Sequence, residues 1–292
     1  MAQWGTFAGV AGVVLFLLLV LTHLTTAAFE ESPDRTSDDG HPSAASRSDG
    51  DPTTRGLEVE GGPAADAVET GAVEAGRGGA DQGVDRPQVE SLSTAALLAN
   101  VALSQGLFAG VLIGAAIYTG IPAEALGITV STDYLVTGLT VGVAIGVALY
   151  VANELGAVSA KRFGVDHNED LREMLAPGSA GGWLVLLVVV LPIIALFEEL
   201  LFRAALIGVL SAGFEISPWV LAVGSSIAFG FGHGIQGTAG VLVTGLLGFV
   251  LAAVFIYTGS LLVVVVAHYL INALEFVVHE GLGLEWAETG GG

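Results

Sequence analysis

The stretch of sequence that decides the fold is residues 183–210, WLVLLVVVLPIIALFEELLFRAALIGVL. A run of this length can cross a bilayer, since a transmembrane helix needs about 20 apolar residues. Three ionisable residues nevertheless lie near its middle, namely Glu198, Glu199 and Arg203. Each charge at that depth costs at least ~2.5–3.5 kcal/mol on insertion scales. Charges inside a membrane are kept where partners offset them, so this cluster indicates a functional site with partners on other helices.

The composition of the whole chain is that of a multi-span membrane protein. Of its 292 residues, 53% are hydrophobic and only 13% are charged, whereas soluble domains are about 25% charged. The absence of cysteine excludes a disulfide framework, a thiol nucleophile and a cysteine-ligated metal. The net charge of −20 argues against a nucleic-acid partner. Membrane lipid is therefore the first partner that the sequence predicts.

Apolar runs punctuated by glycine and proline predict an all-α fold, a polytopic membrane helix bundle of about seven transmembrane helices. The run at 217–233 is short for a bilayer, so we expect it to be inset from one surface and to open a cavity. Abundant glycine inside the runs allows close helix packing in lipid. The predicted spans lie near 5–28, 96–119, 134–155, 181–209, 217–233, 238–257 and 260–279.

The N-terminal part divides into an anchor and a linker. Residues 1–28 have no positively charged start and a long apolar stretch, which favours an uncleaved membrane anchor over a signal peptide. The small residues Thr26-Ala27-Ala28 keep the signal-peptide alternative open. Residues 29–92 are rich in acidic and small residues and cannot bury enough apolar surface to fold, so they predict a disordered acidic linker. The main helical domain is expected at 93–285.

The charge pattern also carries information about the source. The chain has a single lysine, Lys161, and from Glu30 to Glu90 it has 15 acidic residues against five arginines. An acid-rich and lysine-poor balance suits a protein that lives in high salt, where self-repulsion is screened. We therefore expect a multi-pass protein of the cell membrane of a halophilic archaeon.

Two further polar motifs lie on the last apolar runs. His233 ends the short run, and His268 and Asn272 lie inside the last one. His268 and Asn272 are four residues apart, as are Glu199 and Arg203, so each pair shares one helix face. Adjacent residues on a helix are rotated by ~100°. One carboxylate of the Glu-Glu pair can therefore pair with the arginine, while the other faces a cavity as a general base.

These residues resemble the three motifs of the CPBP intramembrane proteases, the CAAX protease and bacteriocin-processing family, also called Abi. The resemblance covers about residues 93–280, in the family's motif order and spacing. The motifs are Glu198-Glu199-x-x-Phe202-Arg203, Phe229-x-x-x-His233 and His268-x-x-x-Asn272.

The resemblance implies an intramembrane endopeptidase that hydrolyses a peptide bond of a membrane-bound protein or peptide, with CAAX-type processing as one form. In the family's terms, Glu198 and His233 activate the attacking water. His268 and Asn272 stabilise the oxyanion, and the Glu–Arg ion pair supports the site. An alternative within the same family is a non-catalytic membrane scaffold or a bacteriocin-immunity protein.

Two other interpretations stay open at this point. Glu198, His233 and His268 could hold Zn²⁺ with an open position for water. The chain has no His-Glu-x-x-His pair, so such ligands would come from separate helices, and we expect metal-free catalysis without a cofactor. Transport through a buried proton pathway would be favoured by an inverted repeat. No second copy of the Glu-Glu-x-x-x-Arg pattern occurs in residues 93–180.

Four polar residues near helix ends are left out of the predicted catalytic set. Glu275 and His279 continue the helix face of His268, so they either extend the polar wall of the cavity or lie at the membrane interface. Asn153 and Glu154 close the 134–155 span. We expect His279 to be interfacial together with Glu280, and Asn153 and Glu154 to be interfacial as well.

Overall fold

A computed structural model of the chain contains the predicted helical bundle. The structure describes residues 1–30, 93–162 and 170–284, and these ranges hold helices and turns with no strand. All helices of these ranges belong to one compact unit. Of the predicted linker at 29–92, only residues 29 and 30 are described, and they continue the first helix. The polytopic helical fold class is confirmed.

Within the described ranges, six helical segments are long and apolar enough to cross a membrane. A seventh apolar helix, Pro218–Phe231, is shorter. Together they occupy the seven predicted positions. The six long segments are Trp4–Thr25, Thr94–Thr119, Thr132–Ser159, Ala180–Phe214, Gly234–Thr258 and Leu261–Gly281.

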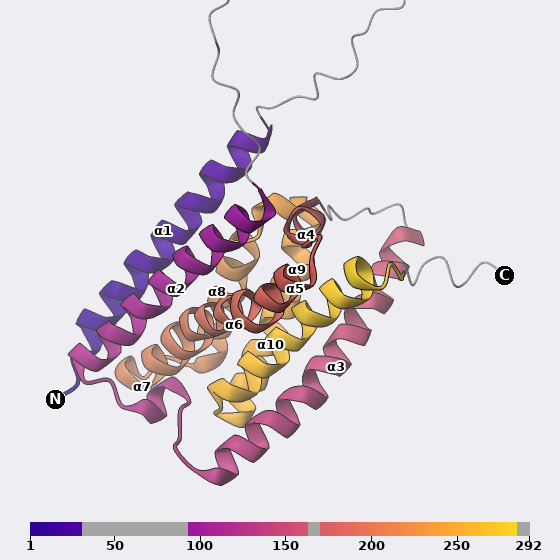
Figure 1. Ribbon diagram of the computed structural model, residues 1–292. Coiled ribbons are helices and arrows are strands. Elements are labelled where there is room, and N and C mark those ends of the chain that lie inside the picture. Colours follow the sequence, from indigo (N-terminus) through magenta and orange to yellow (C-terminus); the bar gives the residue numbers. More distant parts are fainter. Residues whose placement is uncertain (31–92, 163–169, 285–292) are drawn as a thin grey trace, which may run out of the picture. The chain divides into compact units, whose positions relative to one another are not determined.

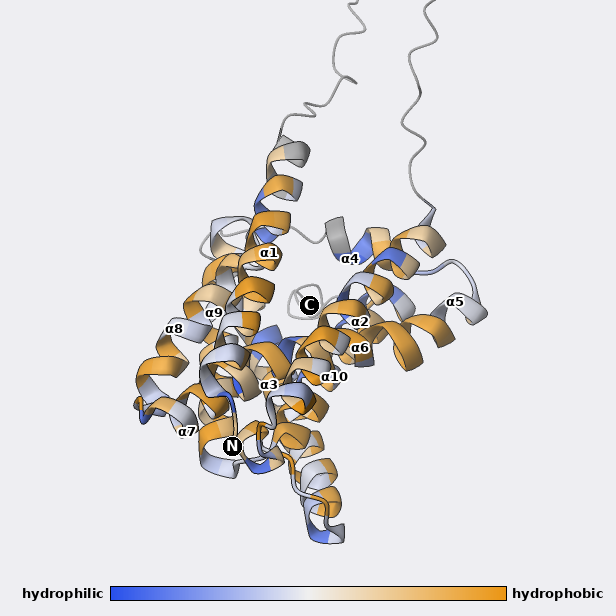
Figure 2. Ribbon diagram, turned by 90° about the vertical axis from the view of Figure 1, so that its left-hand side faces the viewer, coloured by the Kyte–Doolittle hydropathy of each residue, from blue (hydrophilic) through white to orange (hydrophobic). Residues whose placement is uncertain are grey.

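The outer surface of the unit is suited to lipid. Figure 2 shows apolar residues along the whole length of most helices rather than on one inner face. Large side chains such as Leu103, Val188 and Leu246 are exposed, at 74%, 62% and 67%. A surface of this kind is stable in a bilayer, where the helical backbone satisfies its own hydrogen bonds.

The segment that carries the Glu-Glu pair is one long helix interrupted twice by π-helical turns. Pro192 follows the first interruption. Proline lacks an N–H and clashes with the carbonyl four residues earlier, so a locally widened helix accommodates it. The second interruption begins directly after Glu199, and π turns often occur at functional sites. The parts are α5 (Ala180–Val185), η2 (Leu186–Val190), α6 (Leu191–Glu199), η3 (Leu200–Val209) and α7 (Leu210–Phe214).

The short helix α8 (Pro218–Phe231) has 14 residues, which corresponds to ~21 Å at 1.5 Å per residue. A bilayer core is ~30 Å thick, so α8 ends before it could span that thickness. It is followed by the 3₁₀ turn η4 (Gly234–Gln236) and the long helix α9 (Gly237–Thr258). His233 lies at this junction, as the short predicted run implied.

Long helices pack in pairs around the central α6 segment (Figure 1). The last helix, α10, continues into a π turn, η5. In the paired arrangement, α1 lies along α2, α8 along α9, and α3 along α10. The residue ranges of the remaining helices in these pairs are α1 (Trp4–Glu30), α2 (Thr94–Thr119), α3 (Thr132–Arg162) and α10 (Leu261–Glu275), with η5 at Phe276–Gly281.

Three glycines of α3, Gly138, Gly142 and Gly146, allow its backbone to approach α10 closely. A Cβ atom at Gly142 would lie 2.7 Å from Cβ of Val266, and one at Gly146 would lie 2.9 Å from the Ala267 carbonyl oxygen. Real Cβ atoms do not come so close, and small residues at helix contacts are how membrane helices pack tightly. The contact positions α10, which carries His268 and Asn272.

Gly146→Val is therefore expected to push α3 away from α10. Overpacking of this kind costs about 1–3 kcal/mol, so the midpoint of thermal unfolding in detergent should fall by several degrees. Gly114→Val in α2 is the matched control, since a Cβ atom there meets nothing within 4 Å. Equal midpoints for the two variants would contradict the close contact.

Candidate active site

Glu199 and Arg203 form a fully buried ion pair in the middle of the α6–η3 segment. An Nη1 N–H of Arg203 donates to Oε1 of Glu199 at 2.9 Å, and the two side chains are 1% and 0% exposed. This is the pairing that their four-residue spacing predicted. The pair brings two opposite charges together, which lowers the cost of burying either one alone.

Arg203 has two more partners from neighbouring helices. An Nη2 N–H donates to the carbonyl oxygen of Gly248 at 3.0 Å, and the guanidinium carbon lies 4.6 Å from the ring centroid of Phe229. A cation over an aromatic face is stabilised by the ring quadrupole. The arginine therefore joins η3 to α8 and α9.

His268 of α10 lies between the two carboxylates of the Glu-Glu pair. Its Nδ1 is 2.7 Å from Oε1 of Glu199, and its Nε2 is 3.5 Å from Oε2 of Glu198. Because Glu199 is the carboxylate held by the arginine, we assign the proton of Nδ1 to the imidazole, which donates to it. Both acids thus contact the same imidazole ring, through different nitrogens. The sequence reasoning had expected them to serve different neighbours.

We refer to Glu198, Glu199, Arg203 and His268 as the polar cluster. Two carboxylate oxygens in it, Oε2 of Glu198 and Oε2 of Glu199, are buried and have no hydrogen bond from the described residues. An unsatisfied buried polar group costs about 1–3 kcal/mol. The Glu198 side chain is still 12% exposed. A water molecule or a substrate group that supplies the missing hydrogen bond is therefore favoured at Glu198.

His233 adjoins the cluster through an aromatic residue. Its Nδ1 lies 2.9 Å from the carbonyl oxygen of Phe229, which leaves Nε2 for other partners. The Phe229 ring centroid is 4.7 Å from that of His233 and 6.0 Å from that of His268. Phe229 thus lies between the two histidines, beneath the Arg203 guanidinium. The short α8 helix places His233 at the edge of the cluster.

Asn272 is half-buried and lies one helical turn beyond His268 on α10. Within the part of the chain that the structure describes, nothing hydrogen-bonds its side-chain amide. The amide is therefore able to donate to a bound substrate.

The proposed zinc ligands do not converge. Among residues 1–30, 93–162 and 170–284, donor atoms of Glu198, His233 and His268 do not all come within 4.8 Å of one another. Zinc ligands bind at ~2.0–2.3 Å from the metal and so lie closer together. These three residues therefore do not fit a single metal ion.

Sequence reasoning missed two contacts that hold the site together. Ser225 of α8 donates to the carbonyl oxygen of Phe202 at 2.6 Å, which satisfies a backbone group of the π-helical turn. The second missed contact is the hydrogen bond that Arg203 donates to the carbonyl oxygen of Gly248. A serine inside a short apolar run was a usable signal, because polar side chains join helices in lipid. A backbone carbonyl of a glycine gives no such signal.

Glu275 and His279 do not contact the polar cluster. They instead meet Glu154 of α3, which is buried at 4% exposure. Glu154 thus pairs with the imidazole of His279 near the end of α3, a partner that the sequence did not predict.

Comparison with known proteins adds one match. Residues 180–274 match the family model described as type II CAAX prenyl endopeptidase Rce1-like. The match spans α5 to α10 and includes every residue of the polar cluster, His233 and Asn272. No curated protein and no solved structure matches the chain.

Proposed function

Because residues 180–274 belong to the Rce1-like family of type II CAAX prenyl endopeptidases, we propose that this multi-pass membrane protein hydrolyses a peptide bond of a membrane-bound protein or peptide. The observation that carries the proposal is the Glu198 carboxylate, which has a buried oxygen without a hydrogen bond and lies 3.5 Å from His268 Nε2. A carboxylate in this state is suited to hold and activate a water.

In the proposed reaction, Glu198 takes a proton from the water as its oxygen attacks the carbonyl carbon of the scissile bond. His233 assists in orienting the water. When the tetrahedral intermediate collapses, the C–N bond breaks and the proton passes from Glu198 to the leaving amine. General acid–base catalysis of this kind contributes about 10²–10⁴-fold.

His268 and Asn272 are the proposed donors to the oxyanion. The Nδ1–H of His268 donates to Glu199, with Nδ1 at 2.7 Å from Oε1, so in an imidazolium the Nε2–H is the group that would donate toward the developing negative charge. The Asn272 amide supplies the second donor. Arg203 keeps Glu199 in place for this task. Donors of this kind each contribute about 10²–10³-fold.

An apolar groove between α2 and the start of the α5–η2 segment is proposed to receive the apolar part of the substrate. Its volume is ≈ 370 Å³, within the ~300–1,000 Å³ of ligand sites. Leu98, Ala102, Val185 and Val189 are among its lining residues. A prenyl chain, as the family's description implies, is the occupant that we propose. The location that we propose is the cell membrane of a halophilic archaeon.

A cleavage assay in lipid vesicles tests the function. The purified protein is mixed with a synthetic peptide that carries a prenylated cysteine near its C-terminus, and products are identified by mass spectrometry. Wild type should release a C-terminal fragment, and His233→Gln should reduce the rate by at least tenfold. The unprenylated peptide is the control for the proposed binding of the prenyl chain in the groove. If wild type cleaves neither peptide, or if His233→Gln cleaves as fast as wild type, the proposal fails.

A further inference from the structure

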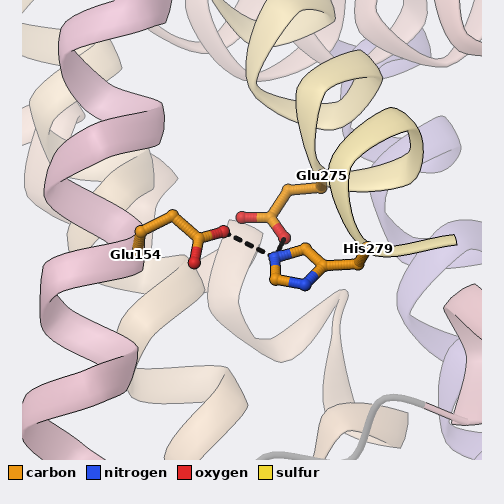
Figure 3. A group of neighbouring side chains, drawn as sticks. All are labelled: Glu154, Glu275 and His279. Atoms are coloured by element: carbon orange, nitrogen blue, oxygen red, sulfur yellow. Dashed lines mark hydrogen bonds and ion pairs between the residues drawn. The ribbon is translucent and has the colours of Figure 1, made fainter. Parts of the chain in front are cut away.

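A second group of titratable side chains lies away from the polar cluster, where the C-terminal part of α3 meets the end of α10 and η5 (Figure 3). We refer to Glu154, Glu275 and His279 as the second cluster. Nε2 of His279 lies 2.6 Å from Oε1 of Glu154 and 3.6 Å from Oε2 of Glu275. One donor atom from each residue lies within 4.8 Å of those of the other two.

The charges around the second cluster do not balance within the described residues. Arg172 of α4 (Asp170–Leu175) contacts Glu280 at 2.8 Å and Glu275 at 3.4 Å. One guanidinium therefore serves two carboxylates. Glu154 is buried, and within the described residues its carboxylate contacts the imidazole of His279. Buried carboxylates in excess of their cations are costly, and a bound cation would offset that excess.

The donor types match a first-row divalent cation. An imidazole nitrogen with two carboxylate oxygens is a set that zinc accepts, with water completing the coordination. Asn153 donates to Oε1 of Glu275 at 2.7 Å. This bond orients the carboxylate and leaves Oε2 directed at the imidazole, as outer-shell partners do in metal sites.

We propose that the second cluster binds one Zn²⁺ through Nε2 of His279, Oε1 of Glu154 and Oε2 of Glu275. The cation takes the place of the hydrogen between His279 and Glu154, so the neutral imidazole binds through an unprotonated Nε2 and carries its N–H at Nδ1. The 2.6 Å contact opens slightly as both atoms turn toward the metal. Arg172 keeps its contact with Glu280.

The site joins α3 to α10 and takes no part in the cleavage reaction. His279 is 11 residues beyond His268, which is ~16 Å along a helix at 1.5 Å per residue. Zinc at the second cluster would therefore lie far from the proposed water-activating carboxylate. Its expected effect is on stability, through a cross-link between two helices.

Zinc stoichiometry in four forms of the full-length protein tests the proposal. Each form is purified in detergent, stripped with chelator, dialysed against low-micromolar Zn²⁺ and measured by elemental analysis. Wild type should bind one zinc per chain. Glu198→Gln/His268→Gln, which changes the polar cluster, should also bind one. Glu154→Gln/His279→Gln should bind zinc at least tenfold more weakly. Glu280→Gln, next to the second cluster, is the matched control and should bind one.

Thermal unfolding gives a second measurement. Zinc should raise the unfolding midpoint of wild type and of the Glu198→Gln/His268→Gln form, because it binds the folded state. It should leave the midpoint of Glu154→Gln/His279→Gln unchanged. If that double variant does not fold, Glu154→Gln alone replaces it, since glutamine keeps the size of the side chain. No zinc in wild type, or zinc lost only when the polar cluster is changed, would overturn the proposal.

Discussion

Glu198→Gln should lower the rate of peptide-bond cleavage by about 10²–10⁴-fold, the contribution of a general base. The change keeps the size of the side chain and removes the carboxylate that we propose accepts a proton from water. The protein should still fold, because the buried Glu198 oxygen makes no hydrogen bond within the described residues that would be lost. Rates are measured on the prenylated peptide in vesicles, with the thermal midpoint as a check of folding.

The matched control is Glu124→Gln, the same change in the 3₁₀ turn η1 (Ala123–Leu126), where the side chain is exposed. Its cleavage rate should equal that of wild type. A Glu198→Gln enzyme that retains more than about a tenth of the wild-type rate would remove the carboxylate from the proposed role of base.

Arg203→Met should destabilise the fold by about 3–5 kcal/mol. The change leaves the Glu199 carboxylate, which is 0% exposed, without its guanidinium partner, and unpairing a buried charge has a cost of this size. It also removes the hydrogen bond to Gly248 and the contact with Phe229. The measurement is the midpoint of thermal unfolding in detergent, compared with that of wild type.

Two companion variants isolate the cause. Arg203→Lys keeps the charge, but an ammonium group lacks the planar guanidinium that donates to both Glu199 and the Gly248 carbonyl. Its stability should therefore lie between those of wild type and Arg203→Met. Glu199→Gln/Arg203→Met removes both charges and should be more stable than Arg203→Met alone. If the double variant is instead less stable than Arg203→Met, the ion pair does not account for the loss.

Local pattern was enough to predict the helices. Hydrophobic length and glycine or proline boundaries identified the seven apolar segments that the described residues contain, because a chain in lipid must close its backbone hydrogen bonds within each segment. Spacing also predicted the Glu199–Arg203 pair, since residues four apart on a helix are neighbours. The resemblance to the CPBP family was recognisable for the same reason, because the motifs that carry it are short and lie within single helices. The π-helical turns around Leu186–Val190 and Leu200–Val209 were not predicted, because they depend on how neighbouring helices pack.

The contacts between helices could not be predicted from local sequence pattern. Sequence reasoning assigned Glu198 and Glu199 to different neighbours, whereas the structure brings both to one imidazole, His268. It also did not predict that packing of α3 against α10 buries Glu154 beside His279. Both outcomes depend on the distance and rotation between two helices. In α3 and α10 these are governed by glycine contacts that no single segment reveals.

By itself, then, the sequence determined that the chain crosses the membrane several times and that charged residues interrupt its apolar helices at defined spacings. Hydropathy and helical periodicity act along one segment, so they can be read from the order of residues. Only the tertiary structure decided which nitrogen of His268 faces which carboxylate, and that Glu154, Glu275 and His279 meet. Contacts between segments far apart in the chain depend on side-chain packing, which the local pattern does not specify.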